Sequence, residues 1–153
     1  MNIKFLYATT QQQHFAGRAY VGDPCYAIHD EQWSDFCEVL TTIPGNEHCT
    51  QDKNGALIMT ATGPIFVCGT AHGDGVYALK KGKEHIADLG VDAGLLAIIP
   101  LAVLHSLGEV DEAKLRQLGA IINVDGIMKA EDGDWEFGDL GCCTSKYCVG
   151  KQL

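Results

Sequence analysis

Three short motifs place an aspartate next to a glycine or proline in a turn-like setting, and these aspartates are the residues best suited to chemistry. The motifs are Gly22-Asp23-Pro24-Cys25-Tyr26, Gly73-Asp74-Gly75-Val76-Tyr77 and Val91-Asp92-Ala93-Gly94. An aspartate in such a turn can hydrogen-bond its own backbone. If several of them converge, their carboxylates can bind the hydroxyls or amines of a ligand, or a hard cation. Both roles remain open from the sequence.

We expect a polar ligand pocket near the Asp74 turn. Gly73 and Gly75 carry no side chains where a ligand would approach. Tyrosines offer a flat apolar surface with a polar tip, which suits stacking on a nucleobase, although they can equally pack the sheet. The predicted ligand-binding residues are Asp23, Tyr26, His72, Asp74, Tyr77 and Asp92. The predicted partner is a polar small molecule, with a nucleotide as one candidate whose phosphates would meet Lys80, Lys81 and Lys83.

A hydrolase is the first alternative. Cys25 with His72 would supply a nucleophile and a base, and Asp23, Asp74 and Asp92 would supply metal ligands. We nevertheless predict that Cys25 is not a catalytic nucleophile, and that no catalytic residue, metal or cofactor is present. The glycine-rich turn at residues 73–75 lacks the following helix of a phosphate-binding or dinucleotide-binding loop.

The charge balance sets limits on the partner. The formal net charge is -9, and nine acidic residues face three basic ones between Glu109 and Asp139. Nucleic-acid binding needs clustered Lys and Arg, so a nucleic-acid partner is not expected. An acidic inhibitor of another protein is the second alternative function.

The cysteines and the apolar run bear on location. The chain has seven cysteines, and its N-terminus resembles no signal peptide, so we expect reduced thiols and a cytoplasmic protein. The apolar run from Ala93 to Leu104 is too short to span a bilayer, so no membrane partner is expected. Whether Cys142, Cys143 and Cys148 bind zinc is left open.

The spacing of turn residues predicts the elements that must position these groups. From Asn54 onward, short apolar segments alternate with glycine-rich turns, which indicates antiparallel hairpins in a meander. Apolar residues at helical spacing predict a helix over 30–40, with Asp30 as its N-cap and Trp33, Phe36 and Leu40 buried. A second short helix is predicted over 110–118. We therefore expect one domain over residues 1–153 with an α+β fold, mainly an antiparallel β barrel or sandwich with one packed helix and a second short helix.

The three motifs and the tryptophan-bearing helix between the first two resemble a group of small uncharacterised proteins from bacteriophage and bacterial genomes. The resemblance covers roughly residues 19–99. It implies a phage or prophage origin and a cytosolic setting, and it assigns no activity or site residue. Together with the incomplete catalytic sets, it favours a non-enzymatic protein that binds or sequesters a small molecule. We also expect a homo-oligomer, because a β-rich chain of this size can leave sheet edges that need cover.

Overall fold

The computed structural model, which describes residues 4–50 and 52–145, contains two antiparallel sheets. The order in the six-stranded sheet is β1 (Phe5–Thr9), β3 (Ala56–Thr60), β4 (Gly63–Gly69), β7 (Leu95–Pro100), β2 (Phe15–Gly22) and β8 (Ala120–Gly126). The order in the five-stranded sheet is β6 (Glu84–Val91), β5 (Gly75–Lys81), β11 (Leu140–Cys143), β10 (Asp134–Phe137) and β9 (Met128–Glu131). Neither sheet closes on itself, so the predicted α+β fold is confirmed and its sheets form a sandwich.

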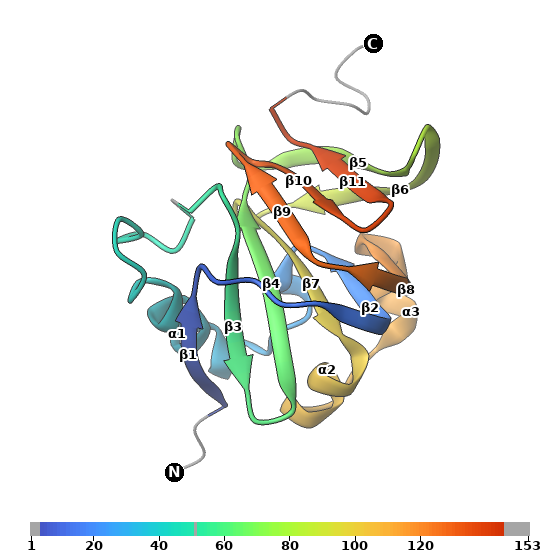
Figure 1. The fold of residues 1–153 in the computed structure, drawn as a ribbon. Coiled ribbons are helices and arrows are strands. Elements are labelled where there is room, and N and C mark those ends of the chain that lie inside the picture. The colour runs from blue at the N-terminus through green and yellow to red at the C-terminus, as the bar shows by residue number, and fades with distance from the viewer. Residues whose placement is uncertain (1–3, 51, 146–153) are drawn as a thin grey trace.

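The six-stranded sheet is the middle layer. Its helix-facing side packs against α1 (Asp30–Leu40), α2 (Leu101–Leu107) and α3 (Glu112–Leu118), and its other side packs against the five-stranded sheet. Neighbouring residues of one strand belong to different cores: Ile58 packs on the helix side and Leu57 between the sheets. This alternation is the period-2 pattern of a strand buried on both faces. In Figure 1 the helices lie around the lower part of the six-stranded sheet, and the five-stranded sheet lies at the upper right.

Helix α1 confirms the predicted core contacts of Phe36 and Leu40. Phe36 is fully buried and Leu40 nearly so, whereas Trp33 is only partly buried. The Phe36 ring meets Phe5 edge-on at 5.5 Å between centroids and stacks on Trp33 at 5.2 Å. Helix α1 is therefore fixed to strand β1 by aromatic packing.

The predicted N-cap of α1 is wrong by one residue. Asp30 is the first helical residue, and His29 occupies the cap position without a side-chain hydrogen bond. Asp30 and Glu31 lie in the first turn instead, where negative charge complements the helix dipole.

The expectation of a simple meander is also wrong. Strand β7 lies between β4 and β2, and β11 lies between β5 and β10, so both sheets contain pairings between segments distant in sequence. Two elements were not predicted. The first is helix α2, which begins where Pro100 ends strand β7 within the apolar run after Gly94. The second is the four-residue strand β11, which carries a glycine and two cysteines and therefore shows no alternating pattern. In the described part of the chain, no helix combines the length and the apolar character needed to cross a membrane.

Candidate functional site

Asp23 joins the first and third motifs. Its side chain is fully buried, and its Oδ1 accepts a hydrogen bond from the Cys25 backbone N–H at 2.8 Å. Its Oδ2 accepts from the backbone N–H groups of Asp92 and Ala93, each at 2.7 Å. One carboxylate thus caps the short 3-10 helix η1 (Pro24–Tyr26) and holds the turn between β6 and β7.

The same two motifs meet again through Tyr26, whose hydroxyl donates to Asp92 Oδ2. The Tyr20 hydroxyl donates to the Asp23 carbonyl oxygen at 2.9 Å. The structure therefore brings Asp23, Tyr26 and Asp92 together, as expected if the aspartates of different motifs lie close to one another. Both Asp23 oxygens, however, bond the protein's own backbone, so this junction is a structural clamp.

Tyr77 of the second motif does not offer a stacking surface. Its side chain is fully buried in the core between the sheets, and its hydroxyl donates to the Gly73 carbonyl oxygen at 2.9 Å. This position agrees with the alternative that Tyr77 packs the sheet, and the role of Tyr77 in ligand binding stays a prediction. Asp74 is exposed on the same turn. A hollow beside this turn is lined by Thr50, Lys53, Thr70, Gly73 and Gly94. Its volume of about 180 Å³ is below the usual size of a ligand pocket.

His72 lies toward the end of strand β11. Its Nε2 is 2.9 Å from the Ser145 carbonyl oxygen. Ser145 in turn donates its backbone N–H and its hydroxyl to the Asp134 carboxylate, each at 2.8 Å. His72 is thus tied to the five-stranded sheet, and it is distinct from the clamp formed by Asp23.

Cys25 is in a poor environment for a nucleophile. Burial, a hydrogen bond with Asp23 and the nearby carboxylates of Asp92 and Asp74 raise the pKa of the Cys25 thiol to about 12. The thiol is therefore protonated at neutral pH, and a thiolate is the reactive form. The described residues also contain no group of three or more His, Cys, Asp or Glu side chains placed to hold a metal ion.

Cys142 and Cys143 lie on opposite faces of the five-stranded sheet. Cys142 packs into the core between the sheets, whereas Cys143 is its neighbour in strand β11 and faces the other side. Cys148 lies outside the described residues. No disulfide joins cysteines within residues 4–50 and 52–145.

A hollow lies on the outer face of the five-stranded sheet. It has a volume of about 490 Å³, within the range of small-molecule pockets. Four neighbouring strands and the turn after β5 line it, through Ala78, Lys80, Gly82, Lys129, Ala130, Glu131, Asp134, Trp135, Glu136, Gly141, Cys142 and Cys143. We call it the sheet hollow.

Cross-strand register explains the shape of the sheet hollow. Gly141 of β11 pairs with Lys80 on one side and with Glu136 on the other, and Glu136 pairs with Lys129. Paired residues of adjacent strands point to the same face, so a residue without a side chain lies between long charged ones. Ala78 belongs to the same face and is only 1% exposed, as expected for a small residue at the bottom of a hollow whose edges are formed by long charged side chains.

The charged groups at the rim are unevenly neutralised. Neither Lys80 nor Lys129 has an ion-pair or hydrogen-bond partner among the described residues. By contrast, Lys81 Nζ lies 3.6 Å from Asp139 Oδ2 and forms an ion pair with it. Burial opposes ionisation of Asp134, but hydrogen bonds from Ser145, Cys143 and Thr144 hold its pKa below the usual value. The rim thus offers free ammonium groups and an ionised carboxylate.

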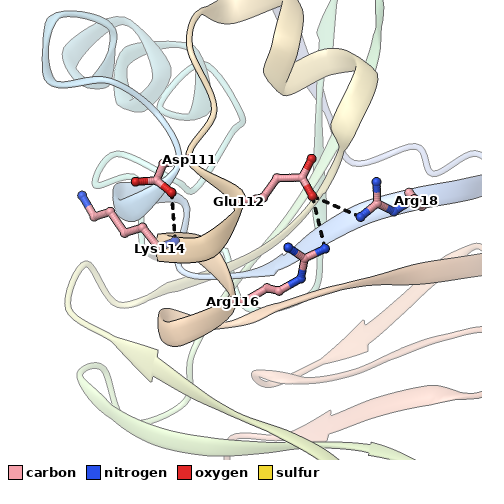
Figure 2. A network of polar contacts seen from close by, with 5 residues as sticks. All are labelled: Arg18, Asp111, Glu112, Lys114 and Arg116. Atoms are coloured by element: carbon pink, nitrogen blue, oxygen red, sulfur yellow. Dashed lines mark hydrogen bonds and ion pairs between the residues drawn. The ribbon is translucent and has the colours of Figure 1, made fainter.

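The chain's two arginines are engaged elsewhere. Arg18 Nη2 on β2 and Arg116 Nη2 on α3 both bond Glu112 Oε1, at 3.1 and 3.2 Å (Figure 2). The Arg18–Glu112 pair links β2 to α3, whereas the Arg116–Glu112 pair lies within α3, and each of these half-exposed pairs contributes less than about 1 kcal/mol. Of the predicted basic cluster only Lys80 lines the sheet hollow, so cationic recognition there depends on lysine.

A smaller hollow of about 310 Å³ borders Cys25 and Tyr26. Its lining includes Asp30, Glu31, Glu109 and Asp111. Four carboxylates against one lysine, Lys114, repel a phosphate group, so this hollow suits a nucleotide poorly.

The fold is thus a three-layer α+β sandwich, and its five-stranded sheet carries a hollow on its outer face. No family model matches the chain, and neither curated proteins nor solved structures give a match.

Sequence reasoning did not find Lys129, Glu131, Asp134, Glu136 or Gly141, because the hollow that they line forms only when β11 pairs with β5, which lies much earlier in the chain. Alternation of charged and apolar residues over 128–137 is the one signal that could have placed their charges on a common face.

Proposed function

We propose that this chain is a non-enzymatic protein that binds a polar small molecule in the sheet hollow. The observation that carries the proposal is a hollow of about 490 Å³ with unpaired Lys80 and Lys129 at its rim. Burying or ordering two ammonium groups beside a hollow is favourable when a ligand supplies their hydrogen-bond acceptors.

The absence of an assembled catalytic set supports binding over catalysis. Within the described residues, the Asp23 carboxylate is occupied by three backbone donors, and the Cys25 thiol stays protonated at neutral pH. A hydrolase would need one of these groups to be available for chemistry. A nucleotide remains a candidate ligand, with its phosphates at Lys80 and Lys129.

Calorimetric titration with cyclic and linear nucleotides and with amino acids tests the proposal. We expect at least one of these compounds to bind the wild type, and we expect Lys80→Ala to weaken that binding at least tenfold because it removes a charged hydrogen bond. Lys83→Ala is the matched control, since Lys83 is an exposed lysine of the adjoining turn that does not line the hollow.

The same titration on Asp74→Ala separates the two sites. Loss of binding in Asp74→Ala, with Lys80→Ala unaffected, would return the ligand to the Asp74 turn. No binding of any compound by the wild type would count against a small-molecule function.

We further propose that the chain forms a homo-oligomer in a cytoplasmic setting, host cytoplasm if it is phage-encoded. Strand β1 is an edge of the six-stranded sheet, and its Leu6 and Tyr7 are 49% and 53% exposed. Exposed apolar residues on an unpaired edge favour pairing with another strand.

Light scattering at micromolar concentration should give a mass above that of one chain. Tyr7→Lys should shift the mass to the monomer, and Ile127→Lys, at an exposed apolar residue away from β1, should not. A monomeric mass for the wild type would contradict the oligomer.

A further inference from the structure

The sheet hollow has opposite charges at its two sides. Lys80 on β5 pairs with His85 and Gly141, neither of which is a carboxylate, so its positive charge is uncompensated across the strands. Lys129 on β9 pairs directly with Glu136, so those two charges offset one another. The positive side of the hollow is therefore at Lys80.

Two carboxylates form the negative side. Glu131 of β9 and Asp134 of β10 are directly paired, with their side chains on the outer face. Like charges in direct cross-strand pairs are destabilising. A cation seated between Glu131 and Asp134 would relieve this repulsion.

The strand order sets the separation of the two sides. Strand β11 lies between β5 and β10, and neighbouring strands are about 4.8 Å apart, so Lys80 and Asp134 lie on strands about 10 Å apart. Gly141 and Ala78 leave the space between them open. One small molecule can therefore reach both sides.

A ligand with charge of a single sign fits this arrangement poorly. An anion at Lys80 would lie in the field of the Glu131 and Asp134 carboxylates, and an amine at those carboxylates would lie near the Lys80 ammonium group. Resting on the proposed function of the sheet hollow, we infer that its ligand is a zwitterion, with its anionic group at Lys80 and its ammonium group between Glu131 and Asp134.

Three matched probes test this inference on the full chain. The first is 6-aminohexanoate, which carries both charges at the ends of a short alkyl chain; hexanoate and hexylamine each carry one of them. We expect 6-aminohexanoate to bind with a Kd at least tenfold lower than either single-charge probe. Lys80→Ala should weaken the binding of 6-aminohexanoate and of hexanoate by a similar factor and leave the binding of hexylamine unchanged or tighter. Glu131→Gln should weaken the binding of 6-aminohexanoate and of hexylamine and leave the binding of hexanoate unchanged or tighter.

Two variants away from the sheet hollow serve as controls. Lys83→Ala and Glu38→Gln alter exposed charges that do not line the hollow, and they should leave all three affinities unchanged. Hexanoate or hexylamine binding as tightly as 6-aminohexanoate would overturn the zwitterion, while the proposed binding function would stand. If none of the three probes binds although a nucleotide does, the zwitterion is likewise overturned, and if no compound binds at all, both proposals fail.

Discussion

Asp23→Asn should lower the free energy of unfolding by about 2–4 kcal/mol. The wild-type carboxylate accepts three backbone hydrogen bonds while fully buried, and hydrogen bonds to a charged group contribute about 1.5–3 kcal/mol each. An amide has the same shape but one acceptor oxygen, so in either orientation its NH₂ group faces a backbone N–H donor. Urea unfolding, with the slope compared between variant and wild type, measures the change.

Asp74→Asn is the matched control for this prediction. Asp74 lies in the same type of motif, but its side chain is exposed, so the substitution should change the free energy of unfolding by less than about 0.5 kcal/mol. Equal stability of the Asp23 and Asp74 variants would mean that Asp23 does not act as a clamp.

Phe36→Ala should cost about 3–5 kcal/mol of stability, because it leaves a cavity in a fully buried region. The ring contacts of Phe36 with Phe5 and Trp33 would be lost with it. The same urea titration applies, and near-ultraviolet circular dichroism should also show a changed environment for Trp33.

Glu38→Ala serves as the comparison on the same helix. Glu38 is exposed, so its replacement tests helix propensity without a cavity, and the change should stay within about 0.5 kcal/mol. A cost for Phe36→Ala no larger than that of Glu38→Ala would contradict the packing of α1 on the six-stranded sheet.

Local patterns in the sequence predicted most elements but not their order. The hairpins formed by β3 with β4 and by β5 with β6 follow from short turns that bring consecutive strands together. The insertion of β7 between β4 and β2 depends on side-chain packing on both faces of the sheet, which no short segment encodes. Helix α2 was missed because an apolar segment buried on several sides lacks a helical period.

The candidate site was predicted less well than the fold. The motifs of Asp74 and Asp92 lie in turns between strands, as predicted, whereas Asp23 caps the 3-10 helix η1. Asp23 and Asp92 do meet, but the Asp23 carboxylate satisfies backbone donors there. The sheet hollow instead combines residues of β5, β9, β10 and β11, spread from Ala78 to Cys143. A site assembled by strand pairing leaves no compact motif in the sequence.

The central place of β11 in the five-stranded sheet has a consequence for the chain during its synthesis. Strand β5 ends at Lys81, and its partner on that side begins at Leu140. At about 5–20 residues per second, a ribosome needs about 3–12 s to make the intervening segment. During this interval one edge of β5 has no partner, and an unpaired edge can add a strand from another chain. The growing polypeptide is thus exposed to aggregation until its last described strand has been made, and a chaperone that covers β5 would act in that interval.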